Sequence, residues 1–229
     1  VVDTLRADRL GCYGYPRPTS PSIDRLAREG VLFENAISVG GNTTTAMAGV
    51  FTGRYPFFAY GAPWTDAPFG MERFRGDAMG PGLPGGMTTL AETLSAAGYQ
   101  TAGFITNPYL KSVFGMQKGF AHYEELFDPG EAAFMPAEQV LPRAFRHLAR
   151  LDWTRPTFVY LHLMDTHGPY REPQAATVGP LAEPLARSRG EWWSAWESLS
   201  TIGVGDHELA REHMIAAYDS AVRHADDAV

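Results

Sequence analysis

The sequence has one cysteine, no long apolar run and no excess of basic residues. A lone Cys12 excludes an internal disulfide and a zinc site built from several thiolates, and we expect it to be a small core residue. No apolar run approaches the roughly 20 residues of a membrane-spanning helix. With 26 acidic and 19 basic residues the formal charge is −7, so no basic stripe exists to neutralise a nucleic-acid backbone.

The length and hydrophobic content are those of one globular domain with a substantial core. The chain has 229 residues, of which 45% are hydrophobic, and it contains no internal repeat. We therefore treat residues 1–229 as a single domain. The chain opens on Val-Val-Asp, which resembles the end of a buried strand, and closes on a helical pattern over residues 218–229 that has no stop signal. We expect it to be an incomplete part of a longer protein, which leaves an N-terminal signal or membrane anchor open.

Residues 40–56 form the stretch around which the other candidate residues are organised. Glycines and a polar Asn42-Thr43 pair precede apolar residues at helical spacing, and Gly53 and Pro56 end the pattern. This predicts a short helix with hydroxyls in its first turn. A helix N-terminus favours an oxyanion or a phosphate, and a hydroxyl placed there beside a metal could act as a nucleophile. The alternative is that Asn42 or Thr43 is only an N-cap.

Three polar side chains follow predicted strands, where open α/β sheets bind ligands. Asp3 follows the first strand and is a candidate metal ligand, or caps a turn. Asn107 follows a strand over residues 100–106, where its amide could contact an oxyanion or form a turn. His167 follows an apolar strand over residues 157–164 that we expect to be central and covered on both faces. We interpret His162, inside that run, as a core histidine.

The remaining pattern predicts helices between these strands. A helix is expected at residues 21–29, with Ile23, Leu26 and Ala27 as its apolar stripe. A second is expected at residues 89–98, where a capping box begins it. A third is expected at residues 131–150, with Phe145 on its core face. Asp206 is expected to cap a final helix, and residues 31–36 to be a short strand or an extended segment. The long loop over residues 56–87 either covers a site near Thr43 or is a surface insertion. Residues 171–205 are expected to be irregular, with a short helix at Trp192, Trp193 and Trp196. This order predicts an α/β fold, a layered α/β/α arrangement with a mainly parallel central sheet.

Several segments, taken in order, resemble the sulfatase family of the alkaline phosphatase superfamily. They are Val1-Val2-Asp3-Thr4-Leu5-Arg6-Ala7-Asp8, Gly11-Cys12-Tyr13-Gly14-Tyr15, Ile23-Asp24-Arg25-Leu26-Ala27, Thr52-Gly53-Arg54-Tyr55-Pro56, Leu90-Ala91-Glu92, Gly98-Tyr99-Gln100-Thr101-Ala102 and Asp165-Thr166-His167-Gly168-Pro169-Tyr170. The resemblance implies an alkaline phosphatase-like fold and a metal-dependent enzyme acting on sulfate or phosphate esters.

The resemblance also implies roles for individual residues. Asp3 matches an aspartate that binds the cation. Thr43, nine residues before Thr52, stands at the position of the nucleophile, which also contacts the metal. Sulfatases have Cys or Ser there and oxidise it to formylglycine, which threonine cannot become; threonine is similar to the nucleophile of related phosphodiesterases and phosphoethanolamine-type transferases. Met47 replaces an arginine of the motif.

His167 and Asn107 correspond to the substrate-binding side of the family's site. His167 matches a histidine that binds substrate, and we assign it assistance to the leaving group as well. Asn107 falls near a Lys-Trp-His segment of the family, whose basic residues are absent here.

The metal site implied by the resemblance lacks ligands in this chain. The family's second metal-binding segment follows the helix that begins near Tyr218, and Asp226 and Asp227 belong to that helix rather than to the missing segment. One carboxylate and one hydroxyl are too few ligands for a hard cation, which binds about six oxygens. We therefore expect the 229-residue chain by itself to be metal-free and inactive.

These features predict a hydrolase of sulfate or phosphate esters with in-line attack by Thr43. Its cofactor would be one or more divalent metal ions (Ca²⁺, Mg²⁺, Mn²⁺ or Zn²⁺). Its partner would be a small-molecule or glycan ester, with no nucleic acid and with a membrane reached only through segments outside this chain. The alternatives are a phosphotransferase of the phosphoethanolamine type and a non-catalytic, sulfatase-like binding protein.

Overall fold

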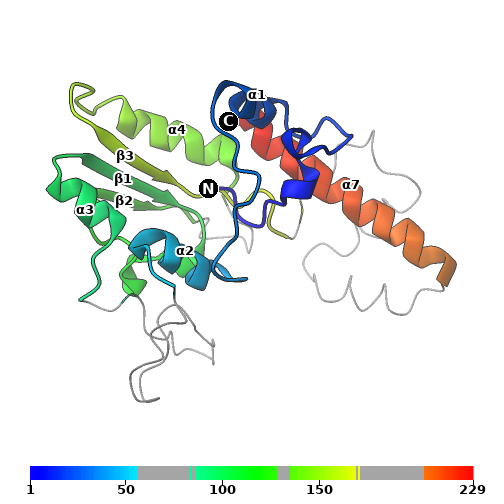
Figure 1. Ribbon diagram of the computed structural model, residues 1–229, viewed down its shortest axis with the longest axis horizontal. Helices are drawn as coiled ribbons and strands as arrows, with labels where there is room; N and C mark the ends of the chain where they lie inside the picture. Colours follow the sequence, from blue (N-terminus) through cyan, green and yellow to red (C-terminus); the bar gives the residue numbers. More distant parts are fainter. Residues whose placement is uncertain (56–82, 84–85, 128–134, 169, 171–203, 229) are drawn as a thin grey trace, which may run out of the picture. The chain divides into compact units, whose positions relative to one another are not determined.

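The computed structural model describes residues 1–55, 83, 86–127, 135–168, 170 and 204–228 (Figure 1). By its packing the chain divides into two compact units, which are described separately. The first unit comprises Val1 and residues 35–127 and 139–162. The second unit comprises residues 2–34, 128–138 and 163–229. The loops predicted at 56–87 and 171–205 lie almost entirely outside the described residues.

A parallel three-stranded sheet forms the centre of the first unit. Strand β1 (Gln100–Ile105) lies between β2 (His122–Glu125) and β3 (Thr157–Leu161), and both pairings are parallel. In this register Ala102 lies opposite His122 on one side and Val159 on the other. The predicted parallel sheet is confirmed.

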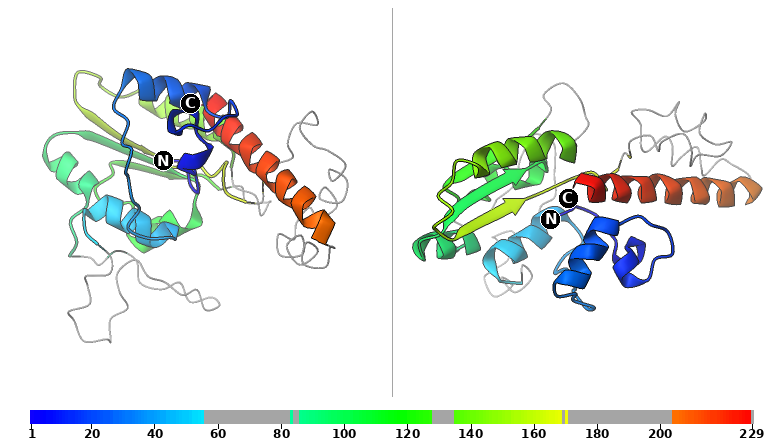
Figure 2. Two further views of the ribbon diagram at one scale, coloured as in Figure 1. Left: turned by 45° about the vertical axis from the view of Figure 1, so that its right-hand side comes forward. Right: turned by 90° about the horizontal axis from the view of Figure 1, so that it is seen from above.

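Helices cover both faces of this sheet. Helix α4 (Ala137–Leu148) lies on one face, and helices α2 (Thr43–Thr52) and α3 (Leu90–Ala96) lie on the other (Figures 1 and 2). Successive strand residues point to opposite faces. Accordingly Phe104 contacts His147 of α4, with ring centroids 5.7 Å apart, whereas Ile105 packs in the core with Phe51 of α2. The predicted α/β/α layering is confirmed.

The core of the first unit lies between α2 and the sheet. Phe51 meets Tyr160 edge to face, with ring centroids 4.8 Å apart. The buried residues of this cluster are Ala48, Phe51, Leu83, Ile105, Leu110, Phe114, Met116 and Tyr160. The predicted capping box is present at the start of α3: Glu92 N–H donates to Thr89 Oγ1 at 3.1 Å, and Thr89 N–H donates to Glu92 Oε2 at 2.8 Å.

The second unit is built on a helix pair. Helix α1 (Pro21–Glu29) packs beside the C-terminal part of α7 (Val204–Ala228), as both views show (Figures 1 and 2). Its core consists of Leu10, Tyr218 and Val222, against which Leu5, Cys12, Ile23 and Tyr170 pack. Short 3-10 turns occur at Ala7–Arg9 and Gly11–Tyr13 here, and at Pro108–Leu110 and Ser112–Phe114 in the first unit.

Several predicted strands differ from the structure. The first residues make only a single parallel bridge, between Val2 and Leu163, and Val1 is 52% exposed rather than buried. Residues 31–36 form no strand. The segment predicted as a central strand, β3 and the residues after it, has β1 on one side and the first residues on the other, but its Val159 is exposed, so the expected coverage on both faces is wrong. Strand β2 was not predicted, because its sequence, His-Tyr-Glu-Glu, has neither apolar alternation nor an apolar run.

Some helix details also differ. Leu26 and Phe145, both assigned to core-facing stripes, are more than 60% exposed. Helix α4 begins at Ala137, and residues 131–134 of the predicted helix lie outside the described part. Helix α7 begins two residues before Asp206, so Asp206 lies within the helix instead of capping it. Among the described helices none has the length and apolarity needed to span a membrane.

Candidate functional site

Thr43 is the first residue of α2 and has the accessible hydroxyl of the threonine run. Asn42 caps the helix, with its Oδ1 accepting a hydrogen bond from Thr45 N–H at 2.9 Å. Thr44 and Thr45 are buried, whereas Thr43 is only partly buried. The N-cap position is therefore filled by Asn42, and Thr43 lies in the first turn, where the positive end of the helix dipole favours a negative oxygen.

Asn107 connects the end of β1 to Thr43. Its Nδ2 donates a hydrogen bond to Thr43 Oγ1 at 3.1 Å, although 64 positions separate the two residues. Its Oδ1 accepts from Tyr109 N–H at 2.9 Å, so the same side chain also forms the turn. Asn107 is 1% exposed, which fixes the amide in this orientation. Asn107 therefore forms the turn that was one of its two expected roles, and its amide nitrogen contacts the Thr43 hydroxyl.

Met47, which stands where the family motif has an arginine, belongs to the core of the first unit. Its Sδ lies 3.1 Å from the hydroxyl of Tyr160, and the same hydroxyl lies 3.1 Å from His162 Nδ1. His162 is 1% exposed, in keeping with the core histidine expected there. Met47 therefore brings no charge to the first turn of α2.

Asp3 is held by the loop that contains His167, within the second unit. Asp3 N–H donates to Leu163 O at 2.9 Å, and the Asp3 carbonyl accepts from Thr166 Oγ1. Thr4 donates in return through Oγ1 to Thr166 O at 2.7 Å. Thr4 adopts φ 55°, a left-handed conformation that threonine disfavours, so these contacts impose it on the backbone next to Asp3.

His167 has its ring oriented by its own loop. Its Nδ1 lies 2.7 Å from Gly168 O, and because a carbonyl only accepts, Nδ1 carries the proton of this contact. In the neutral ring Nε2 is then the nitrogen that can accept a proton. The loop is closed by His167 N–H donating to Met164 O at 2.8 Å.

Tyr218 of α7 fixes the segment after Asp3, a role that its sequence position did not reveal. Its hydroxyl donates to Thr4 O at 2.7 Å and accepts from Arg6 N–H at 2.8 Å. Burial raises the pKa of Tyr218 to about 12. The ring of Tyr218 belongs to the core of the second unit, and the contacts of its hydroxyl become visible only in the folded chain.

The predicted site residues thus fall into two pairs. Thr43 and Asn107 are in direct contact within the first unit. Asp3 and His167 are connected through Thr166 within the second unit. Asp226 is a structural residue: its two carboxylate oxygens accept from Ser22 N–H and Ile23 N–H at the start of α1, at 2.9 and 2.7 Å.

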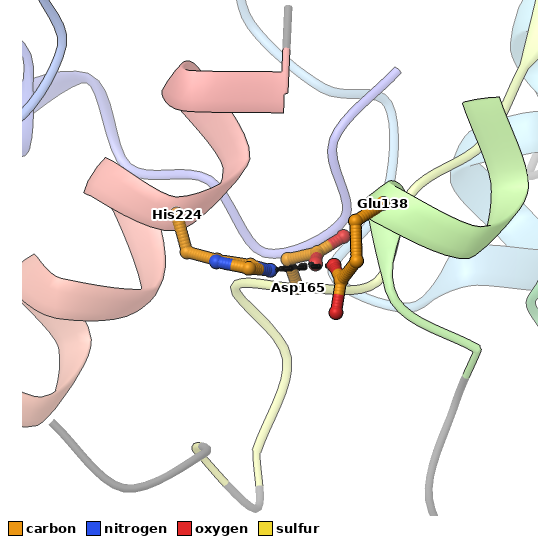
Figure 3. Close-up of side chains that lie close together, drawn as sticks. All are labelled: Glu138, Asp165 and His224. Atoms are coloured by element: carbon orange, nitrogen blue, oxygen red, sulfur yellow. Dashed lines mark hydrogen bonds and ion pairs between the residues drawn. The ribbon is translucent and has the colours of Figure 1, made fainter. Parts of the chain in front are cut away.

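A second polar cluster lies in the second unit. Figure 3 shows Glu138 at the start of α4, Asp165 in the loop after β3 and His224 of α7 pointing toward one another. His224 Nε2 lies 2.8 Å from Glu138 Oε2 and 3.4 Å from Asp165 Oδ1. Burial raises the pKa of the Asp165 carboxyl, and the hydrogen bond from Ala137 N–H, 3.0 Å from Oδ1, opposes this effect. Sequence reasoning missed the cluster, since its members lie 27 and 59 positions apart along the chain.

The residues around Asp3 do not complete a metal site. Within the part of the chain that the structure describes, Glu138, Asp165 and His224 are the one group of three His, Cys, Asp or Glu side chains whose ligand atoms converge, and Asp3 is not among them. A single carboxylate is a weak site for a divalent cation.

Comparison with known proteins gives concordant results. Human arylsulfatase D is 35% identical over 101 residues, which are 44% of this chain and 16% of that protein. The soluble domain of lipooligosaccharide phosphoethanolamine transferase A from Neisseria meningitidis matches with a TM-score of 0.60 at 17% identity, over 99% of this chain and 57% of that one. A protein of the alkaline phosphatase superfamily from Vibrio parahaemolyticus matches with a TM-score of 0.53 at 20% identity, over 100% and 48%.

The two structural matches show that the chain has the same overall fold as these proteins, in agreement with the predicted α/β fold. The chain spans less than a fifth of the length of arylsulfatase D and about half of the two matched structures. The family model for sulfatases matches residues 1–229, the full length of the sequence. The chain belongs to the sulfatase family.

Proposed function

We propose that this chain is part of a metal-dependent enzyme that cleaves sulfate or phosphate esters through a nucleophilic Thr43. The observation that carries the proposal is the contact between Asn107 Nδ2 and Thr43 Oγ1 at the first turn of α2. A donor aimed at this oxygen and the positive end of the helix both stabilise it as it gains negative charge. Membership of the sulfatase family supports ester chemistry of this class.

The reaction would begin with in-line attack by Thr43 Oγ1 on the sulfur or phosphorus atom. The bond from that atom to the alcohol oxygen breaks, and the group becomes esterified to Thr43. We assign the proton transfer to His167, whose Nε2 would take up the proton that Thr43 Oγ1 releases and pass it to the oxygen of the leaving alcohol. Water then cleaves the threonine ester and restores the hydroxyl. A divalent cation would neutralise the ester oxygens, with Asp3 and Thr43 among its ligands.

A phosphotransferase is the second candidate, and the identity of residue 43 favours it. Threonine lacks the chemistry for conversion to formylglycine, whereas its hydroxyl can form a stable ester intermediate. In this case an acceptor hydroxyl replaces water in the second step. A non-catalytic, sulfatase-like binding protein is the third candidate, and Met47 in place of the motif arginine favours it.

The test is an assay of the complete gene product on nitrophenyl sulfate, nitrophenyl phosphate and a nitrophenyl phosphodiester. We expect turnover that is lost in EDTA and in Thr43→Ala and is retained in part in Thr43→Ser, which keeps the hydroxyl. Turnover that survives Thr43→Ala in a folded protein would refute the nucleophile. The transferase predicts in addition that an added alcohol accelerates release of nitrophenol, and absence of turnover on all three esters favours the binding protein.

A further inference from the structure

We infer that Glu138, Asp165 and His224 form a binding site for a divalent transition-metal ion of the zinc class, separate from the metal site proposed at Asp3. The three side chains come from the start of α4, the loop after β3 and the last turns of α7 (Figure 3). Each offers one ligand atom, and these atoms all lie within 4.8 Å of one another.

The burial of Asp165 indicates that the cluster is more than a surface ion pair. The Asp165 side chain is 2% exposed, and its Oδ2 is buried without a hydrogen-bond partner. A buried carboxylate oxygen with no donor carries a desolvation cost that a bound cation would offset. His224 lies 3.4 Å from the other oxygen of this carboxylate, so the side chain is directed at the remaining two ligands.

Two of the three ligand distances fit tetrahedral coordination after a small adjustment, and the ligand atoms of Glu138 and Asp165 lie within 4.8 Å of each other. Metal–ligand bonds of about 2.0 to 2.1 Å place the ligands of a tetrahedral zinc ion about 3.3 Å apart. His224 Nε2 and Asp165 Oδ1 already lie 3.4 Å apart. His224 Nε2 and Glu138 Oε2, at 2.8 Å, must separate by about half an ångström, which two partly exposed side chains allow.

The ligand types select the class of ion. One imidazole nitrogen with two carboxylates suits Zn²⁺ and its neighbours in the first transition row, whereas Mg²⁺ and Ca²⁺ prefer oxygen ligands alone. Because His224 and Glu138 are 43% and 48% exposed at their side chains, water can complete the fourth position. An ion here would join three segments of the second unit that are far apart in sequence.

Zinc binding to the 229-residue chain, stripped with EDTA and dialysed, tests the site. Titration with Zn²⁺ by calorimetry and with Co²⁺ by visible absorption should give one ion per chain, which would contradict the metal-free chain expected from the sequence. His224→Ala removes the nitrogen ligand itself. Loss of a residue that only orients a metal ligand lowers metal affinity about 10- to 100-fold, so His224→Ala should weaken zinc binding by more than this. Glu138→Gln should also weaken it, and circular dichroism checks that both variants are folded.

Asp3→Asn is the matched control, because it alters only the metal site of the proposed function. Binding that survives Asp3→Asn and is lost in His224→Ala or Glu138→Gln supports the inference, whatever the outcome of the ester assays. Binding that is lost in Asp3→Asn and retained in His224→Ala and Glu138→Gln overturns it. Absence of Zn²⁺ and Co²⁺ binding to the folded chain overturns it as well.

Discussion

The amide of Asn107 donates a hydrogen bond to the hydroxyl oxygen of Thr43 at 3.1 Å. Asn107→Asp keeps the oxygen that accepts from Tyr109 N–H and removes the donor to Thr43. Loss of one donor to a developing oxyanion lowers kcat on the order of 10²-fold. We therefore expect such a loss in Asn107→Asp, measured as nitrophenol release by the complete gene product.

Asn107→Ala serves as the comparison, because it removes the turn contact as well. Asn107→Ala should lower kcat as much as Asn107→Asp does and should also lower the melting temperature of the protein. An Asn107→Asp enzyme that turns over at the wild-type rate would contradict a role for this amide in catalysis.

Gly119 cannot be replaced by alanine without a clash. A Cβ at this position would lie 2.0 Å from Glu92 N and 2.5 Å from Ala91 C, at φ +85°. Gly119→Ala should therefore cost overpacking of about 1–3 kcal/mol in addition to the left-handed backbone penalty. Gly14→Ala is the control, since Gly14 has φ +92° but no atom within 4 Å of the added Cβ. Urea unfolding should give the larger loss for Gly119→Ala, and equal losses would show that the α3 backbone moves aside.

Asp226 and Asp227 are adjacent in the sequence but have different structural roles. Asp226 is buried and accepts two backbone N–H groups at the start of α1, whereas Asp227 pairs with Arg223 at the surface. Replacing a helix cap by alanine costs about 0.5–2 kcal/mol. Removing an exposed i,i+4 ion pair costs about 0.3–0.5 kcal/mol. Chemical denaturation should therefore separate Asp226→Ala from Asp227→Ala, and a larger effect for Asp227→Ala would contradict the capping role.

Ionisation of Tyr218 makes the free energy of unfolding depend on pH in the alkaline range. Its pKa is about 12 in the folded chain because of burial, against 10.0 for a free tyrosine. Between pH 10.0 and 12 the Tyr218 hydroxyl keeps its proton in the folded chain but loses it in the unfolded chain. The contribution of this hydroxyl to the free energy of unfolding is therefore complete below pH 10.0 and is lost as the pH rises toward 12. At pH 8 Tyr218→Phe should cost about 1–3 kcal/mol, because Thr4 O and Arg6 N–H lose their shared partner.

The measurement is the difference in unfolding free energy between wild type and Tyr218→Phe from pH 8 to pH 11. The difference should shrink as the pH rises. A difference that stays constant over this range would mean that the hydroxyl ionises as easily in the folded chain as in the unfolded one.

Local signals in the sequence were sufficient to predict most helices and strand β1, but not the central position of β1 in the described sheet. The Thr89 capping box, the Asn42 cap and strand β1 depend on residues a few positions apart, and the structure has all three. The parallel sheet followed from the alternation of strands and helices. Strand β2 was not predicted, because its polar sequence has no strand pattern and becomes a strand only by pairing with β1.

The sequence alone determined the family, the α/β/α layering and the position of Asn107 at a strand end. Only the tertiary structure decided that Asn107 contacts Thr43, that Tyr218 holds Thr4 and Arg6, and that Asp226 caps α1. Glu138, Asp165 and His224 likewise meet only in the folded chain. The physical reason is that a cap or a periodic face depends on neighbours within one or two turns, whereas a side-chain contact between residues far apart in the sequence depends on how whole elements pack.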